Sequence, residues 1–311
     1  MLRFLITLLI FTLVAMPATS HAEESQPLTL ERIFASPALS GSTLRQVRLS
    51  PAGDRVTFVQ GRITDQDMMD LWEYSIADAK TRILVRADEV IQGDVTLSAE
   101  EQARRERARI SSLRGIVSYQ WSSDGRFLLF PLGGNIYVMD MTDETDTVRQ
   151  ITSSIDFDTD PKISPDGSYV AYIQNQNLWV SDLTTNQAWP LTSDGGGVIK
   201  NGMAEFIAQE EMGRNTGYWW SPDSKSIAFL RIDESPIQIS RRYEVNADQI
   251  QMVEQRYPYA GTSNVLNQLG IVRVQKGIDD QPIWIDLGEE TNIYVPRVKW
   301  RPDGRGLTYQ R

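Results

Sequence analysis

The chain has 311 residues, of which 41% are hydrophobic and 23% charged, and its formal net charge at pH 7 is -10. This composition is typical of a folded globular protein and excludes general disorder. The excess of acidic residues argues against a nucleic-acid partner, because a phosphate backbone favours a basic surface. It favours cationic ligands instead, such as the free amino end of a peptide.

Residues 1–22 have the pattern of a secretory signal peptide. Arg3 precedes an apolar stretch, which is followed by small residues around a cleavage point at Ala22. The apolar core of about 12 residues is too short to cross a bilayer of about 30 Å as a helix, although an uncleaved anchor is the alternative. We therefore expect a mature chain that begins at Glu23 in a bacterial periplasm, with no membrane contact after cleavage.

The residue types that are missing limit the chemistry of the chain. It has no cysteine, which excludes disulfides, thiol catalysis and cysteine-based zinc sites. Its single histidine, His21, lies in the expected signal peptide, so the mature chain can form neither a Ser-His-Asp triad nor a histidine-ligated metal site. We therefore predict no metal, no cofactor and no catalytic residue in this chain.

A turn phrase followed by an apolar run occurs five times. The copies are LSPAGDRVTFV, WSSDGRFLLF, ISPDGSYVAYI, WSPDSKSIAFL and WRPDGRGLTY, and their turns begin at Ser50, Ser122, Ser164, Ser221 and Arg301. The shortest step, from Ser122 to Ser164, agrees with the roughly 40 to 45 residues of a four-stranded propeller blade, and the other steps are longer through insertions.

The chemistry of these phrases favours strands joined by tight turns. Proline presets the second position of the turn, aspartate bonds back to the backbone, and glycine accepts a positive φ. Apolar runs without strict alternation, such as 127–130 and 227–230, suit strands that are covered on both faces. The sequence thus predicts an all-β propeller domain over residues 23–311, with helical insertions and about four to five blades. Because the chain stops within the strand after the fifth turn, we interpret Arg311 as an artificial end and the propeller as incomplete.

The first insertion, at about 97–114, is predicted to be a helical arm. Ser98 and Glu101 have capping-box spacing, and an apolar stripe continues to Leu113, which predicts a helix from about Ala99 to Leu113. Its arginines either pair with glutamates on a solvated face or reach a cavity and bind a carbonyl or carboxylate group.

The second insertion, at about 194–217, contains a short helical stretch with two adjacent acidic residues, Glu210 and Glu211. Adjacent side chains on a helix diverge by about 100°. Two such carboxylates can hold one ammonium group, which has three donors, although two exposed glutamates are the ordinary alternative. The third insertion, at about 233–270, contains YPYAGTSN over 257–264, which is interpreted as an irregular loop between strands.

Three segments together resemble the N-terminal part of bacterial dipeptidyl peptidase IV, in the prolyl oligopeptidase superfamily. They are AEFIAQEEMGRNTGYWWSPDSKSIAFLRIDESPI, YPYAGTSNVLNQLGIV and the early LTLERIFASPALSG, and the resemblance covers about residues 26–311. It implies an eight-bladed propeller capped by a C-terminal α/β-hydrolase domain. It further implies a serine exopeptidase that releases dipeptides with proline or alanine at the second position. The catalytic triad would then lie beyond Arg311, and this fragment would be inactive alone.

The resemblance also implies roles for individual residues. Glu210 and Glu211 would bind the α-ammonium of the substrate, and Arg107, with Arg109 in reserve, would contact a backbone carbonyl. The expected partners are peptides with a free N-terminus, the hydrolase domain in the same polypeptide, and a second copy in a homodimer. The alternatives are a non-enzymatic, TolB-like periplasmic propeller scaffold and another oligopeptidase of the superfamily, for which the glutamate pair has no use.

Overall fold

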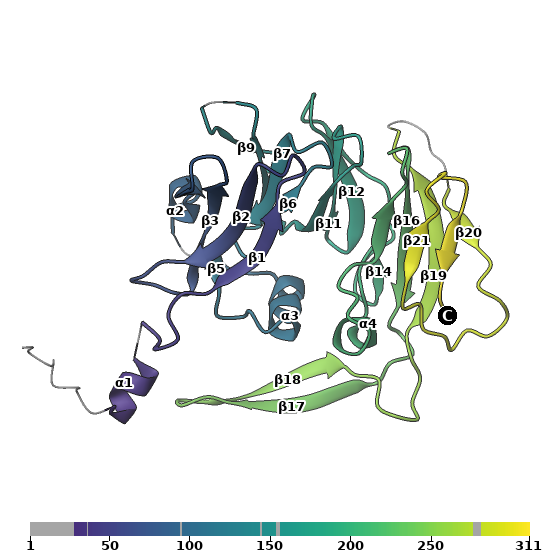
Figure 1. The fold of residues 1–311 in the computed structure, drawn as a ribbon. Helices are drawn as coiled ribbons and strands as arrows, with labels where there is room; N and C mark the ends of the chain where they lie inside the picture. The colour runs from purple at the N-terminus through teal and green to yellow at the C-terminus, as the bar shows by residue number, and fades with distance from the viewer. Residues whose placement is uncertain (1–27, 36, 94, 144, 154–155, 276–280) are drawn as a thin grey trace, which may run out of the picture.

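The computed structural model describes residues 28–35, 37–93, 95–143, 145–153, 156–275 and 281–311. The expected signal peptide and His21 lie outside these residues. The described chain is mostly β-strand, and its larger sheets follow one another in chain order (Figure 1). None of the helices in the described ranges is long and apolar enough to cross a membrane.

Four larger antiparallel sheets, which we call A to D, are formed by the described residues. Sheet A contains β1 (Leu44–Leu49), β2 (Arg55–Gly61), β3 (Met68–Ser75) and β4 (Lys80–Val85), and β5 (Arg114–Gly115) adds in parallel to β3. Sheet B contains β6 (Gln120–Trp121), β7 (Phe127–Leu132), β8 (Asn135–Asp140) and β9 (Val148–Gln150). Sheet C contains β10 (Thr159–Ile163), β11 (Tyr169–Gln174), β12 (Asn177–Asp182) and β13 (Ala188–Pro190).

Sheet D is the most elaborate of the four. It contains β14 (Ile199–Asn201), β15 (Tyr218–Trp220), β16 (Ser226–Asp233), β19 (Leu266–Arg273) and β20 (Ile283–Ile285), and both β14 and β15 pair with β16. Two separate strand pairs complete the β structure: β17 (Ile239–Val245) with β18 (Ile250–Arg256), and β21 (Val298–Trp300) with β22 (Leu307–Tyr309). The helices are α1 (Leu30–Phe34), α2 (Ala87–Val90), α3 (Ala99–Arg107) and α4 (Phe206–Glu210).

Hydrophobic cores lie between consecutive sheets, which explains the apolar runs without alternation. In β7, Leu128 and Phe130 belong to the core shared with sheet A, whereas Phe127 and Leu129 belong to the core shared with sheet C. Successive side chains of a strand point to opposite faces, so a strand covered on both faces needs apolar residues at every position. Each large side chain buried in this way contributes about 1.5–3 kcal/mol. The predicted covering of both faces is confirmed.

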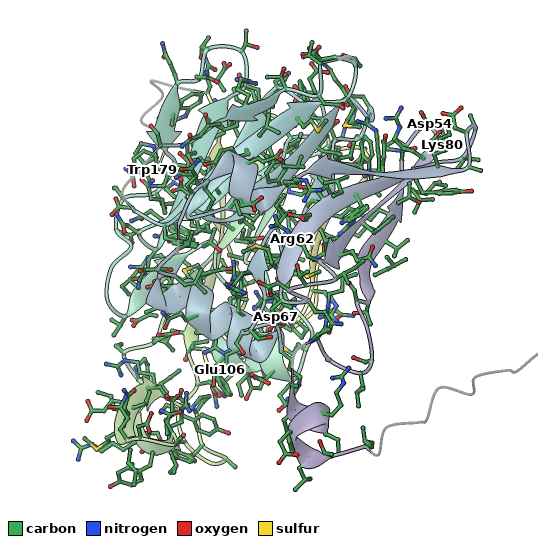
Figure 2. The ribbon with its side chains drawn as sticks, turned by 90° about the vertical axis from the view of Figure 1, so that its left-hand side faces the viewer. Asp54, Arg62, Asp67, Lys80, Glu106 and Trp179 are labelled. Carbon is green, nitrogen blue, oxygen red and sulfur yellow. The ribbon has the colours of Figure 1, made fainter. Side chains whose placement is uncertain are left out.

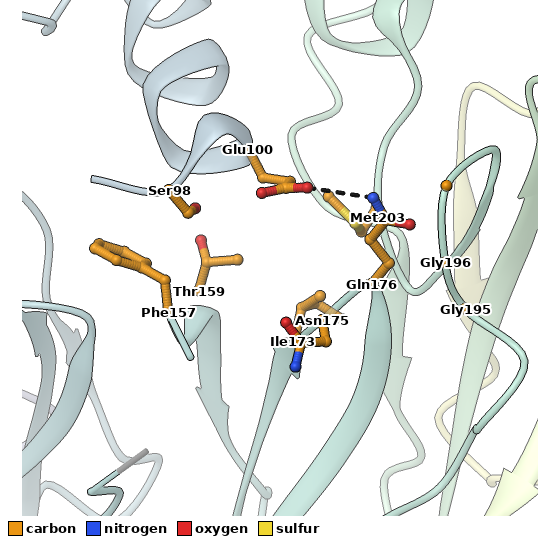
Figure 3. A pocket seen from close by; sticks show the side chains of 11 residues that line it. Ser98, Glu100, Phe157, Thr159, Ile173, Asn175, Gln176, Gly195, Gly196 and Met203 are labelled. Carbon is orange, nitrogen blue, oxygen red and sulfur yellow. Dashed lines mark hydrogen bonds between the residues drawn. The ribbon is translucent and has the colours of Figure 1, made fainter. Parts of the chain in front are cut away.

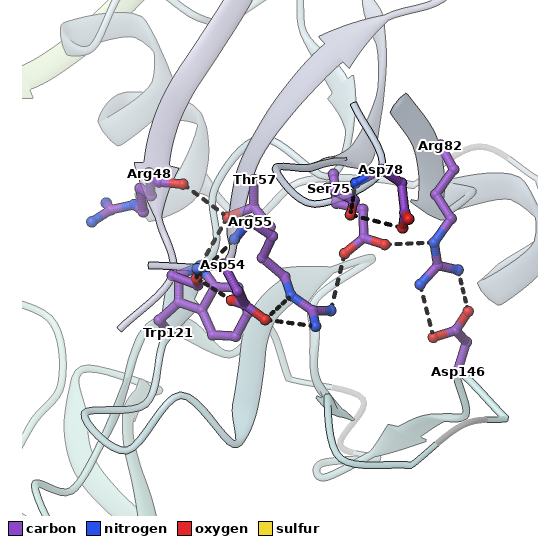
Figure 4. Close-up of polar contacts among 11 residues, drawn as sticks. Arg48, Asp54, Arg55, Thr57, Ser75, Asp78, Arg82, Trp121 and Asp146 are labelled. Carbon is purple, nitrogen blue, oxygen red and sulfur yellow. Dashed lines mark hydrogen bonds and ion pairs between the residues drawn. The ribbon is translucent and has the colours of Figure 1, made fainter. Parts of the chain in front are cut away.

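Polar contacts also join neighbouring sheets. The indole nitrogen of Trp121 in β6 donates to Oγ1 of Thr57 in β2 at 2.8 Å, and Arg82 of β4 pairs with Asp146 in the connection between β8 and β9 (Figure 4). Sheets A and B are therefore held together by packing, by a hydrogen bond and by an ion pair.

The three turns at Ser122, Ser164 and Ser221 share one hydrogen-bond pattern. In the turn at Ser164, the buried hydroxyl donates to Asp166 Oδ1 at 2.6 Å and accepts from the amide of Tyr169 at 2.9 Å. Gly167 has a φ of +75° there, and Ser224, which takes the glycine position in the fourth copy, has a φ of +60°. The turn chemistry predicted from the sequence is thus present, with one serine in a backbone region that favours glycine.

Helix α3 is shorter than the predicted helix, which extended to Leu113. Arg109 has a φ of +56°, and the amide of Ile110 donates to the carbonyl of Arg105 at 2.9 Å. This is a Schellman ending, in which a left-handed residue stops the helix. The last apolar residue of the stripe, Leu113, is buried in the core between sheets A and B, so it packs from a turn rather than from the helix.

The inserted elements gather at one end of the sheets. Figure 1 shows α3 and α4 at the lower end of the blades and the β17–β18 hairpin below them. Helix α3 lies between β4 and β5 of sheet A in the chain, whereas α4 and the hairpin are both inserted within sheet D.

Candidate functional site

Helix α3 is fixed against sheet C by a buried carboxylate. Glu101 is 3% exposed and accepts hydrogen bonds from Arg104 at 2.6 Å, from Arg105 at 2.7 Å and from the hydroxyl of Thr159 at 3.1 Å. Burial by itself raises the pKa of Glu101, but the bonds from Arg104 and Arg105 outweigh burial and lower this pKa. The start of the helix is capped by Ser98, whose hydroxyl accepts from the amide of Glu101 at 3.2 Å.

A second contact holds the first turn of α3. The side-chain nitrogen of Gln176, in the turn between β11 and β12, donates to Glu100 Oε1 at 3.2 Å. Both side chains line a cavity of about 270 Å³ together with Met203 and the glycine loop at 195–197 (Figure 3). The arm is therefore anchored to sheet C at two adjacent residues.

Helix α4 carries the acidic pair and has only five residues. The carboxylate of Glu205 caps its start by accepting from the amide of Ala208 at 2.9 Å. Glu210 is the last residue of the helix and Glu211 its C-cap, and both are exposed. Such a short helix is not stable by itself, so its position depends on the contacts around it.

Arg107 at the end of α3 reaches α4. Its Nη1 donates to Gln209 Oε1 at 3.0 Å, and its guanidinium lies 5.0 Å from the ring centroid of Phe206. Burial lowers the pKa of Arg107, and among the nearby carboxylates Glu210 opposes this shift most strongly. An arginine stays charged under such conditions, so a guanidinium and a carboxylate face the same space.

Two adjoining cavities lie between α3, α4 and the β17–β18 hairpin. The larger, about 590 Å³, is lined by residues of all three elements, including Arg104, Gln209 and Arg242. The smaller, about 240 Å³, is lined by Arg107, Arg109 and Glu210 among others. We call these two spaces together the arm cavity.

The hairpin closes the arm cavity on the side away from the blades. Arg242 of β17 pairs with Glu106 of α3 at 3.4 Å and with Glu244 of its own strand at 2.8 Å. Figure 2 shows Glu106 on the side of α3 that faces the hairpin. The polar face of the hairpin thus lines the arm cavity, while side chains such as Tyr243 and Val245 on its other face are exposed.

The structure brings together three of the four predicted site residues. Arg107, Arg109 and Glu210 line the same part of the arm cavity, whereas Glu211 is not among its lining residues. Arg107 is half-buried and hydrogen-bonded to α4, while Arg109 is exposed. Divergence of adjacent side chains on a helix accounts for the separation of the two glutamates.

Several residues that build the site were not identified from the sequence. Gln209 and Phe206 hold Arg107, and Glu205 pairs with Arg214 beneath α4. The signal for Glu205 was present, because an acidic side chain directly before a short helix often caps its first amides. Within the described ranges, no group of three or more histidine, aspartate or glutamate side chains is placed to hold a metal ion.

The chain has recognisable relatives among known proteins. A family model described as "Dipeptidyl peptidase IV (DPP IV) N-terminal region" matches residues 122–311, a range that contains α4 and both glutamates but not α3. Human dipeptidyl peptidase 8 is 28% identical over 243 residues, which cover 67% of this chain and 27% of the relative. The probable dipeptidyl-aminopeptidase B of Penicillium rubens is 24% identical over 317 residues, which cover 94% of this chain and 33% of the relative. The chain therefore spans about a quarter to a third of the length of these relatives.

A solved structure has a similar fold. The crystal structure of Porphyromonas gingivalis dipeptidyl peptidase 4 matches with a TM-score of 0.64 and 21% sequence identity, covering 85% of this chain and 36% of that chain. Together with the sheets described above, this likeness confirms the predicted all-β, propeller-like fold.

Proposed function

We propose that this chain presents the amino end of a peptide to a serine peptidase domain of the same polypeptide, because the chain belongs to the family of dipeptidyl peptidase IV N-terminal regions. The full protein would release dipeptides from peptide N-termini, with proline or alanine at the second position. Its relatives are dipeptidyl peptidases, and this chain corresponds to only part of their length.

The observation that carries this proposal is the meeting of Arg107 and Glu210 at the arm cavity. A carboxylate accepts from a peptide ammonium, and a guanidinium donates to a peptide carbonyl. Both interactions strengthen where water is excluded. Glu211, on the next position of the chain but outside the lining of the arm cavity, would approach the ammonium from a second side.

This arrangement explains why such an enzyme would select a bond at a fixed number of residues from the amino end of a peptide. Only the first residue of a peptide carries an α-ammonium group, so a chain that continues past this point offers the carboxylates no such group. Holding the amino end fixes the distance from that end to the bond to be cleaved. Positioning of this kind raises the rate of the reaction at the bond that it selects.

The test is kinetic and uses the full-length protein. Replacing Glu210 or Glu211 with glutamine keeps the shape and removes the charge, and we expect a loss of about 2–4 kcal/mol of transition-state stabilisation for free-amine substrates. Glu89→Gln is the matched control, since Glu89 is an exposed glutamate that pairs with Arg86 beside α2, away from the arm cavity. Unchanged specificity constants in both the Glu210 and Glu211 variants would falsify the proposal.

The chain studied alone offers a second test. Because the proposed catalytic triad is not among its residues, we expect no hydrolysis of a Gly-Pro anilide by this chain. Turnover that co-purifies with the chain and scales with its concentration would contradict this assignment. Secretion to a periplasm and assembly as a homodimer belong to the same proposal, and they are tested by cell fractionation and by the mass of the full protein in solution.

A further inference from the structure

An ion pair is buried beneath α4, at the base of the segment that carries the acidic residues. Glu205 precedes the helix and Arg214 follows it, and these residues are 3% and 5% exposed. Arg214 Nη2 lies 3.7 Å from Glu205 Oε1. The two charged side chains therefore meet below the helix and close the segment 205–214 into a loop.

The same two residues also hold the backbone of the helix. The carboxylate of Glu205 accepts from the amide of Ala208 at 2.9 Å, and the amide of Arg214 donates to the carbonyl of Ala208 at 2.8 Å. Ala208 is fully buried, and Gly213, with a φ of +59°, turns the chain back beneath the helix. Both ends of the segment thus converge on the middle of α4, which is too short to be stable without them.

This pair is not an efficient source of stability. Nη1 of Arg214 donates to the carbonyl of Thr216 at 2.8 Å, but Nε and Nη2 have no hydrogen-bond partner in the described part of the chain. Burial lowers the pKa of Arg214 and raises the pKa of Glu205. A buried ion pair with unused donors is often no better for stability than two apolar side chains of similar volume. What the pair does supply is a fixed geometry for the segment above it.

We propose that Glu205 and Arg214 are positioning residues that set the placement of Glu210 and Glu211 relative to Arg107. This inference rests on the proposed function. The pair acts from below α4, while the contacts of Arg107 with Gln209 and Phe206 act from the side of α3. Without the contact between Glu205 and Arg214, the segment 205–214 still packs through Ala208, but its end with Glu210 and Glu211 can shift.

The test compares two substrates of the full-length protein, a dipeptidyl anilide and the same anilide without its α-amino group. The ratio of their kcat/KM values measures recognition of the ammonium and does not change with the fraction of folded enzyme. For Arg214→Met, which keeps the length and removes the charge, we expect this ratio to fall about tenfold or more. Arg214→Lys keeps a positive charge and should restore part of the ratio.

The double variant Glu205→Gln with Arg214→Met distinguishes an effect on the position of the acidic residues from an effect on the stability of the protein. Its melting temperature should equal or exceed that of Arg214→Met alone, because no unpaired buried charge is left. Its substrate ratio should stay low. A ratio that returns to the wild-type value in the double variant would overturn the inference, since the charges would then be unnecessary for positioning.

A control and a reference variant complete the design. Arg62→Met removes the partly exposed partner of the buried Asp70 in sheet A, away from α4, and should leave the substrate ratio unchanged. Glu210→Gln reports on the proposed function itself. If Glu210→Gln and Glu211→Gln both keep the full ratio, the proposed function fails. If they lose it while Arg214→Met keeps it, only the positioning role fails.

Discussion

Arg107 donates a hydrogen bond of 3.0 Å to Gln209, and this single bond joins two insertions that belong to different blades. Helix α3 lies between β4 and β5 of sheet A, and α4 lies within sheet D, so the contact links the first of the four sheets to the fourth. Because Gln209 directly precedes Glu210, the bond also fixes the distance between the guanidinium and the acidic end of α4. The geometry of the proposed site thus depends on how the blades stand relative to each other.

The order of the two candidate arginines can be tested directly. Replacing Arg107 with methionine in the full-length protein should lower kcat/KM for a dipeptidyl anilide. The expected loss of transition-state stabilisation is about 1.5–3 kcal/mol, the range for a lost charged hydrogen bond. Arg109→Met should change it by much less, because Arg109 is exposed and is held in place by its backbone at the end of α3. Steady-state kinetics decides between them, and a larger loss for Arg109→Met would reverse the assignment.

Glu101 should stabilise the fold in a manner that depends on pH. Its pKa in the folded state is lowered, so its contribution is present above its ordinary pKa of 4.5 and is lost as the pH falls through the lower folded value. Replacing Glu101 with glutamine leaves Arg105 buried without its partner and should cost about 3 kcal/mol at pH 7. Urea unfolding of both proteins measures this difference.

The difference in free energy of unfolding between wild type and Glu101→Gln should become smaller when the unfolding is repeated near pH 4. Glu100→Gln is the matched control, since Glu100 lies on the same turn, is less buried, and a glutamine oxygen there can still accept the hydrogen bond from Gln176. A gap that is constant from pH 7 to pH 4 would show that the charge of Glu101 contributes nothing.

Asp158 should have the opposite dependence on pH. This carboxyl group is fully buried, and burial raises its pKa from 3.8 to about 6. A raised pKa means that the folded state holds the proton more tightly, so the stability from this group is present below pH 3.8 and is lost as the pH rises through 6. Asn at this position can still accept from Gln174, which donates to Asp158 Oδ1 at 2.7 Å.

For Asp158→Asn, the free energy of unfolding relative to wild type should therefore increase between pH 5 and pH 8, by about 1 kcal/mol. Urea titrations at the two pH values give this difference. A relative stability that decreases over the same interval would mean that the folded-state pKa of Asp158 is not raised.

The repeated turns should contribute similarly to stability. Replacing Ser164 with alanine removes an acceptor from the amides of Ser168 and Tyr169 and a donor to Asp166, and the serine is 1% exposed. The expected cost is about 2 kcal/mol, as for a buried group that loses its partner. Ser235→Ala, at an exposed serine outside the turns, is the control and should change the melting temperature little. Equal melting temperatures for the two variants would contradict the role given to the turn hydroxyl.

The blades could be predicted from the sequence because their signals are local. Each turn is specified by four neighbouring residues, and the buried serine, the aspartate and the positive φ at Gly167 or Gly125 follow from that short pattern. The apolar runs indicated strands with two covered faces, and Leu128 and Leu129 indeed pack into different cores. The family resemblance was carried by longer segments and is confirmed by the family match over 122–311.

The site could be predicted only in part, because its geometry comes from contacts between distant residues. The apolar stripe at 99–113 did not reveal that Arg109 turns left-handed and ends the helix. Adjacent glutamates predicted a shared ligand, but only Glu210 lines the arm cavity with Arg107. The pairing of Glu205 with Arg214 could not be inferred, since both residues look like ordinary surface charges until the chain folds back at Gly213.

The Schellman ending of α3 leaves little tolerance for changes in the length of the arm. Arg107 lies in the last turn before the left-handed residue, so one inserted or deleted residue between Ser98 and Arg107 would rotate its guanidinium by about 100° around the helix axis. The cap at Ser98 and the left-handed Arg109 thus fix the two ends of the helix, and with them the direction of the guanidinium. Homologous arms that serve the same purpose should vary in amino-acid identity far more readily than in residue count.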